Sequence, residues 1–281
     1  AEVVRSASEP NFLGMVPVFD GSFLGPLCVG AAALSSAELI RRHGARATAV
    51  EAGLEPLARI VGLVFANLAF PMFLDHARSG LALVLSGALT TWIAVGRGNP
   101  PAILTGMLFQ FFGGVTFLQF VSSRSETPLL NLPWMGGMLV AAGGMASGLR
   151  LSRDGALARF APVGLAWGLC WWWGTHHEEI ARHVLRQFQT AADVGLVAVT
   201  ALLLLLGGAR FRWPAATAAS ALLLPGLLFW ALATWQTTAH PGADLGWLAW
   251  PVAAGAMMLV LRRLEGLAPT RWIQVGHGFA L

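Results

Sequence analysis

The charged residues of this 281-residue chain are confined to short clusters, and long apolar runs separate those clusters. Each run is about 18 to 22 residues long, the length that a helix needs to cross ~30 Å of hydrocarbon. Only 11% of the residues are charged and 56% are apolar, whereas a soluble domain carries roughly a quarter charged residues. We therefore predict an all-α integral membrane protein with about nine transmembrane helices. The predicted spans are 23–40, 56–73, 79–97, 101–121, 132–150, 158–174, 191–208, 213–235 and 245–263.

The chain has 18 arginines and no lysine, and the arginines lie at the ends of the apolar runs. Nine spans put thirteen of them on one side of the membrane and five on the other. Because arginine is retained on the cytoplasmic side during insertion, we expect a bacterial inner-membrane protein whose N-terminal segment lies on the periplasmic side. No continuous basic face exists, which excludes nucleic acid as a partner. The majority side holds Arg41, Arg42, Arg46, Arg59, Arg97, Arg150, Arg153, Arg159, Arg210, Arg212, Arg262, Arg263 and Arg271.

The chain contains a parallel internal repeat of four helices. Residues 23–36 align with 134–147 at an offset of 111, and 99–117 align with 212–230 at an offset of 113, with Gly113 on Gly226. Matched proline and glycine positions in separate segments favour a true repeat over chance similarity between apolar sequences. The predicted organisation is an outer-side N-terminal segment (1–22), a first repeat (23–121), a second repeat (132–235) with an outer-side insertion (176–189), and the start of a third repeat (245–281), which we expect to be truncated near Trp272.

Several residues inside the spans have structural interpretations. Pro71, Pro225 and Pro251 predict kinks or helix starts, since neighbouring helices can satisfy the freed carbonyl groups. Gly144 and Gly148 predict close helix packing, and the amides of Asn67, Gln110 and Gln119 predict hydrogen bonds between helices. Cys28 and Cys170 fit small buried thiols. No acidic residue or arginine is expected at mid-membrane depth, which disfavours an ion-coupled pump.

The sequence resembles one bacterial family in a set of aromatic and proline landmarks. These are Trp171–Gly174 followed by Glu179, Arg212–Pro214, Trp247–Pro251 followed by Leu261–Glu265, His277, and Arg97–Pro100 with Gln110. On these landmarks the chain resembles the domain-of-unknown-function 2339 family of predicted multi-pass membrane proteins. The resemblance implies a long, many-spanning inner-membrane protein and implies no catalytic or binding residue.

The insertion contains His176, Glu179 and His183, whose spacings of three and four put them on one face of a helix. Imidazole and carboxylate groups suit a divalent transition metal. The alternative is a short amphipathic helix on the outer surface, lying along the membrane plane, with Glu178 and Arg182 paired at i,i+4. We favour that surface helix and predict no metal and no cofactor. Glu179 is also a candidate catalytic carboxyl, because adjacent aromatic rings would desolvate it.

Trp171, Trp172 and Trp173 stand at the predicted outer end of their span. An aromatic belt at headgroup level explains such residues. The functional alternative is a surface on which a glycan or a lipid-linked glycan stacks.

Three functions stay open at this point. The favoured one is a non-catalytic scaffold or transport component of the cell envelope, with membrane lipid, a glycan or lipid-linked glycan, and other envelope proteins as candidate partners. The second is a membrane-embedded enzyme with an outer-face active site at Glu179. The third is a carrier for a neutral solute, with Asn67 and Gln110 lining its path.

Overall fold

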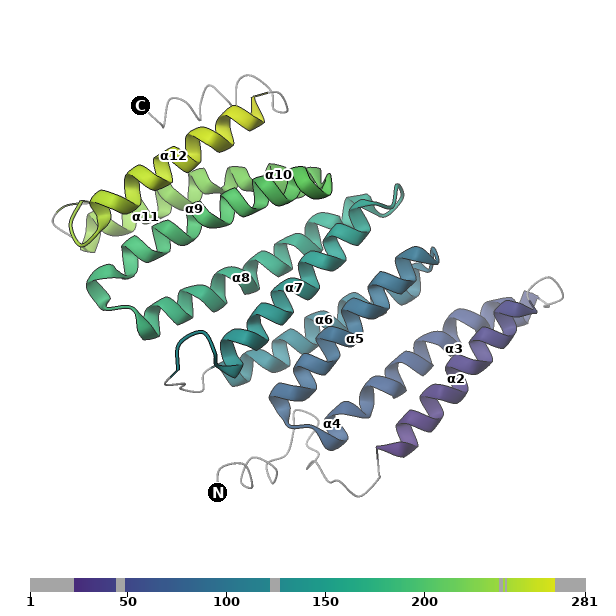
Figure 1. The fold of residues 1–281 in the computed structure, drawn as a ribbon. Helices are drawn as coiled ribbons and strands as arrows, with labels where there is room; N and C mark the ends of the chain where they lie inside the picture. The colour runs from purple at the N-terminus through teal and green to yellow at the C-terminus, as the bar shows by residue number, and fades with distance from the viewer. Residues whose placement is uncertain (1–22, 44–48, 122–126, 238–239, 241, 266–281) are drawn as a thin grey trace, which may run out of the picture. The chain divides into compact units, whose positions relative to one another are not determined.

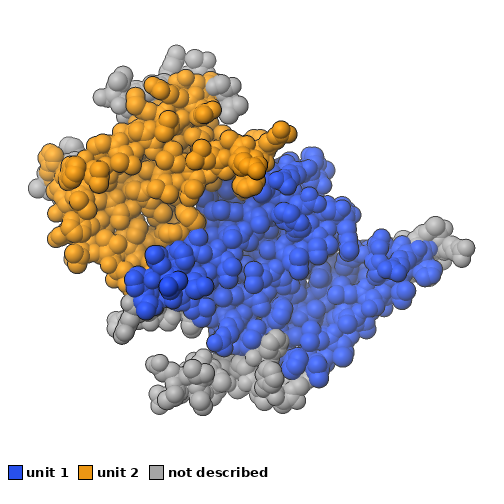
Figure 2. Space-filling model, viewed as in Figure 1, with its two compact units in different colours: residues 1–171 blue, residues 172–281 orange. Residues whose placement is uncertain are grey.

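The computed structural model describes residues 23–43, 49–121, 127–237, 240 and 242–265. Every regular element in this part of the chain is a helix (Figure 1). The chain divides into two compact units, Ala1–Trp171 and Trp172–Leu281 (Figure 2), and the division falls inside one helix. The predicted N-terminal segment 1–22 and the end of the third repeat, with Trp272 and His277, lie outside the described residues.

The first unit is a series of helices. Its elements are α2 (Leu24–Arg42), α3 (Ala49–Leu68), α4 (Phe70–Phe73), α5 (His76–Gly96), α6 (Pro100–Val121), α7 (Leu132–Ser152), η1 (Ala158–Phe160) and the first half of α8 (Ala161–His183). Asp75 caps α5 and Asn131 caps α7, each by accepting a hydrogen bond from a backbone N–H of the first turn. In Figure 1, α2 and α3 run side by side in opposite directions.

The second unit contains the rest of α8, α9 (Arg186–Phe211), α10 (Pro214–Ala219), η2 (Ser220–Leu222), α11 (Leu223–Thr237) and α12 (Gly246–Leu264). The elements α10, η2 and α11 together cover the single predicted span 213–235. Pro225 has no N–H to give to the carbonyl of Ala221, and the 3-10 turn η2 occurs at that point. The expected proline kink is confirmed there, whereas Pro251 lies inside an uninterrupted α12.

Each of the nine predicted spans coincides with a helical segment, and seven of these are long and apolar enough to cross a membrane. The other two are α7 and α8. Both have sufficient length, at 21 and 23 residues, but glycines lower the mean hydropathy of α7, and the polar residues of its last turns lower that of α8. The structure thus confirms the helical class and seven candidate spans among the described residues.

Many large apolar side chains lie on the outside of the helices, and several polar side chains are buried. The side chains of α6 that face outward are large and apolar and recur every three or four residues: Leu104, Leu108, Phe111, Phe112, Val115 and Leu118. Ser79, Thr91 and Gln110 are buried instead. Cys28 and Cys170 are exposed, so the prediction of buried thiols was wrong. A pattern of apolar runs cannot tell a helix face turned to lipid from one turned to protein.

Backbone contact at glycines joins neighbouring helices. A Cβ atom built on Gly87 of α5 would lie 2.5 Å from the carbonyl oxygen of Gly106 on α6 and 2.8 Å from the amide nitrogen of Gln110. A Cβ atom on Gly144 of α7 would lie 2.9 Å from the amide nitrogen of Gly168 on α8. The predicted packing role of Gly144 is therefore confirmed. Small residues at such positions let helix backbones approach closely enough for van der Waals contact.

A buried polar network connects three helices of the first unit. The Gln110 amide of α6 donates to Ser147 Oγ on α7 (2.9 Å) and to Thr91 Oγ1 on α5 (3.3 Å). The predicted interhelical role of Gln110 is confirmed. Asn67 instead donates to Leu63 O within its own helix, and Gln119 is exposed.

Replacement of Gly87 tests the backbone contact. We expect Gly87→Ala to lower the free energy of unfolding by about 1–3 kcal/mol, because the new methyl group overpacks against backbone that cannot move aside. Gly207→Ala is the control, since a Cβ atom there meets nothing within 4 Å. That variant should be as stable as the parent or up to about 1 kcal/mol more stable. Thermal unfolding of the detergent-solubilised protein measures both, and equal effects would contradict the packing role.

Candidate functional site

The polar stretch after the Trp run does not form a separate surface helix. It continues α8 without a break to His183, so the predicted short helix along the membrane plane was wrong. No proline interrupts the stretch, and Arg182 Nε donates to Glu178 Oε1 (2.9 Å), which confirms the predicted i,i+4 pair. Gln189 of α9 donates hydrogen bonds to the carbonyl oxygens of Ala181 and Val184, and so caps the C-terminal end of α8. Helices α8 and α9 therefore extend beyond their apolar parts and join at a polar end.

His177 and Asp193 form the central contact of this polar end. His177 Nδ1 lies 3.0 Å from Asp193 Oδ1, and the contact joins the last turns of α8 to the second turn of α9. Asp193 is only 1% exposed, whereas 47% of the His177 side chain is exposed. A buried carboxylate that holds the Nδ1–H of an imidazole fixes the orientation of the ring and leaves Nε2 for an external partner.

Aromatic and hydroxyl groups surround this pair within the second unit. The rings of His177 and Trp230 are 6.1 Å apart, centre to centre. The rings of Trp172 and His176 on α8 are 4.2 Å apart, centre to centre, and tilted by 45°. Trp172 also donates from Nε1 to Thr200 Oγ1 (2.9 Å). The site thus combines an exposed imidazole, a buried carboxylate and flat apolar surfaces, a combination suited to a ligand that is both polar and apolar.

Glu179, the predicted catalytic carboxyl, points away from solvent. It is 8% exposed, and its Oε1 lies 3.5 Å from His183 Nε2. Its burial agrees with the desolvation expected of this carboxyl, whereas its catalytic role stays a hypothesis. The helix continues past Glu179 and packs this face of α8 inward, so the side chain has a structural environment.

The three predicted metal ligands are not gathered around one point. His183 approaches Glu179, but His176 Nδ1 lies 2.8 Å from the carbonyl oxygen of Trp172, on its own helix. Among the described residues no group of three or more His, Cys, Asp or Glu side chains could hold a metal ion.

Trp171, Trp172 and Trp173 each have a different environment, because successive residues of a helix point about 100° apart. Trp171 is buried in the first unit, with its ring 6.0 Å from Phe117 and 5.9 Å from Trp167. In the second unit Trp172 bonds to Thr200, and Trp173 packs against the core of α9, α11 and α12. Of the three, Trp172 lies within the polar site.

Sequence reasoning missed the roles of His177 and Asp193. Asp193 lies near the start of the predicted span 191–208, and an acidic residue in an apolar run was the available signal. Its partner is sixteen residues earlier, on another helix, and no spacing rule connects the two. The residues proposed to line a solute path, Asn67 and Gln110, are both buried in contacts to other protein groups.

No family model, no curated protein and no solved structure matches this chain. The resemblance to the domain-of-unknown-function 2339 family therefore stays a prediction from its landmarks.

A double-mutant cycle tests the contact between His177 and Asp193. Asp193 has one side-chain partner in the described part of the chain, so His177→Ala should leave it unsatisfied and destabilise the protein by about 1–3 kcal/mol. In an Asp193→Ala background the same change should cost much less. Glu178→Gln, in an exposed pair, should cost about 0–1 kcal/mol. Unfolding in detergent gives all the values, and equal costs of His177→Ala in both backgrounds would argue against the contact.

Proposed function

We propose that this chain is a multi-pass protein of the bacterial inner membrane, and that it acts as a non-catalytic scaffold or transport component that binds an amphipathic ligand of the envelope. A lipid or a lipid-linked glycan has the required chemistry. The outward apolar faces and buried polar groups support a lipid-solvated bundle. The observation that carries the ligand proposal is the exposed His177, held by the buried Asp193 beside aromatic rings.

All nine helical segments cross the membrane in this proposal, including α7 and α8. Backbone contact between Gly144 and Gly168, and between Gly148 and Gly164, lets these two helices insert as a closely packed pair. The excess of arginine at one set of helix ends supports a cytoplasmic location for that set and a periplasmic location for the α8–α9 polar end.

The parallel repeat is part of the proposal, and equivalent contacts support it. A Cβ atom on Gly113 would meet Val84 of α5, and one on Gly226 would meet Val197 of α9, at the offset of 113 in both positions. Helix α7 packs on α5, and α12, the start of the proposed third copy, packs on α9. Gly143 of α7 lies near Val84, Ala88 and Gln110. At an offset of 113, these four residues correspond in turn to Ala256, Val197, Ala201 and Leu223. All four of the corresponding residues belong to one hydrophobic cluster of the second unit.

The two copies differ at the positions that matter for function. Gly80 and Phe117 of the first copy correspond to Asp193 and Trp230 of the second. In the first copy, a Cβ atom on Gly80 would lie 2.9 Å from the amide nitrogen of Phe117, so the position has no room for a side chain. The polar site is thus a departure of the second copy from a shared framework, which supports a specialised role there.

A second candidate function is an enzyme with its active site at the same place. An imidazole oriented by a buried carboxylate is the arrangement of a general base, since the carboxylate stabilises the imidazolium that forms on proton uptake. This observation favours His177 over Glu179 as the reacting group.

Thiol labelling in intact cells tests the membrane arrangement. The native Cys28 and Cys170 are exposed and are first changed to alanine. A single cysteine at Arg153, after α7, should be protected from an impermeant maleimide, and one at Leu185, between α8 and α9, should react. Reaction at Arg153 with protection at Leu185 would overturn the orientation, and equal reaction at both would show that α8 does not cross.

Complementation separates binding from catalysis. In a strain that lacks the protein, we expect His177→Ala to impair growth under envelope stress at unchanged membrane abundance, with Glu178→Gln as the control. His177→Asn keeps a donor for Asp193 but cannot exchange a proton near neutral pH. Function retained by His177→Asn supports ligand binding, and function lost supports the enzyme. Full function of His177→Ala would contradict both.

A further inference from the structure

Two adjoining cavities open at the arginine-rich end of the first unit, between the α2–α3 pair and the α5–α6 pair. Their volumes are about 440 and 710 Å³, and both are lined by Arg59 and Arg97. The smaller cavity continues inward along the apolar side chains of Leu34, Leu63 and Ile93. The larger one is lined by polar groups at the helix ends. Together they form one amphipathic space.

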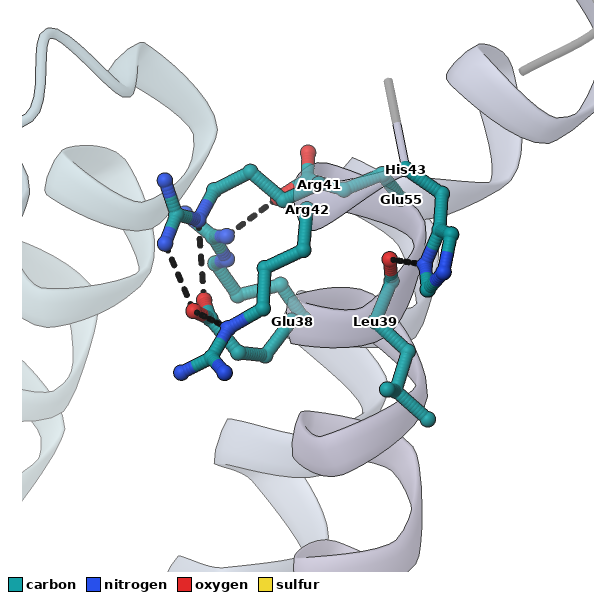
Figure 3. A network of polar contacts seen from close by, with 7 residues as sticks. Glu38, Leu39, Arg41, Arg42, His43 and Glu55 are labelled. Carbon is teal, nitrogen blue, oxygen red and sulfur yellow. Dashed lines mark hydrogen bonds and ion pairs between the residues drawn. The ribbon is translucent and has the colours of Figure 1, made fainter. Parts of the chain in front are cut away.

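The lining carries a surplus of positive charge. Four guanidinium groups, those of Arg41, Arg42, Arg59 and Arg97, face two carboxylates, which leaves two positive charges in excess. Figure 3 shows Arg41 and Arg42 converging on Glu38, at N–O distances of 2.6 and 2.9 Å. Glu55 pairs with Arg59, and both of these side chains are largely buried.

Arg97 ends α5 and forms no ion pair with any described residue. The turn after it passes through Gly98, at φ 61°, and leads directly into α6. The amide groups of that helix start do not supply anion donors. Pro100 and Pro101 have no N–H, and the N–H of Ala102 is bonded to Asn99 Oδ1 (3.1 Å). The lining also contains the neutral side chains of Thr90 and Asn99, but the guanidinium groups are its charged donors, and they suit a phosphate better than a neutral group does.

We propose that this amphipathic space binds an anionic phospholipid, with its phosphate headgroup at Arg42, Arg59 and Arg97 and one acyl chain along the Leu34, Leu63 and Ile93 surface. Like charges gathered at the end of a helical bundle repel one another, and a phosphodiester compensates them. Headgroups lie at the depth where the apolar spans end, so the charged and apolar parts of the space match those of a lipid. This inference rests on the proposed membrane location and concerns a site separate from the α8–α9 polar end.

The test uses the full chain in detergent, with phosphatidylglycerol, phosphatidylcholine, inorganic phosphate and glycerol 3-phosphate as probes. Native mass spectrometry and thermal shift report binding. Phosphatidylglycerol should bind at least tenfold more tightly than each of the other three. Arg42→Gln/Arg97→Gln should lose most of this preference, and it leaves Glu38 paired with Arg41 and Glu55 paired with Arg59. Arg78→Gln, in an exposed pair with Asp75, is the matched control and should bind as the parent does.

Three outcomes would overturn the proposal. Equal binding of phosphatidylglycerol and phosphatidylcholine would remove the role of charge. Equal binding of glycerol 3-phosphate or inorganic phosphate would identify a soluble anion as the ligand. An unchanged preference in the double variant would place lipid binding elsewhere. Fractionation of cells is measured first, because a chain found outside the membrane fraction refutes the membrane location itself and not the cavity assignment alone.

Discussion

Direct backbone contact between neighbouring helices is the constraint on which the rest of this structure depends. In the proposed membrane location, an apolar side chain gains nothing by leaving one apolar environment for another, so close packing and polar contacts must hold the helices together. Glycines on facing helices provide that proximity, as Gly87 and Gly106 do between α5 and α6. Only at such short range can Gln110 of α6 reach hydroxyl groups on α5 and α7. The outer helix faces are then free to be apolar, and the polar groups gather inside or at the ends.

The helices could be predicted because long apolar runs between charged clusters record the length of each helix directly in the sequence. The packing of Gly144 and the role of Gln110 could also be predicted. Within an apolar span, a small residue usually allows a neighbouring helix to approach, and an amide usually hydrogen-bonds to one. The exposure of Cys28 could not be predicted, because lipid and protein are equally apolar neighbours. The extension of α8 to His183 was also missed. The polar end of a long helix has the same pattern of residues in the sequence as a separate surface helix. The last turns of α8 are fixed by contacts with α9, which the sequence does not reveal.

If the two units are copies of one repeat, as proposed above, their corresponding positions differ in chemistry. The first unit has an amide and two hydroxyls in its interior, where the corresponding part of the second has the apolar cluster around Leu223. The second unit instead has a carboxylate at Asp193. At the corresponding position of the first unit, the backbone of Gly80 lies too close to the backbone of Phe117 to leave room for a side chain. A bundle tolerates few buried polar groups, because each needs a partner at once. The first unit satisfies this need with the hydroxyl groups of Thr91 and Ser147, and the second with the exposed imidazole of His177.

The position of Gln110 also has a consequence for biogenesis. Its amide hydrogen bonds to Ser147, which lies 37 residues later in the chain, across the turn that leads into α7. In the proposed membrane location, a helical hairpin of α5 and α6 alone would present much of that amide to hydrocarbon until α7 arrives, at a cost of a few kcal/mol. Premature release of the hairpin from the insertion machinery is therefore disfavoured, and the three helices gain most by entering the bilayer as a group. A side chain that joins three helices in the finished protein thus also favours one order of assembly.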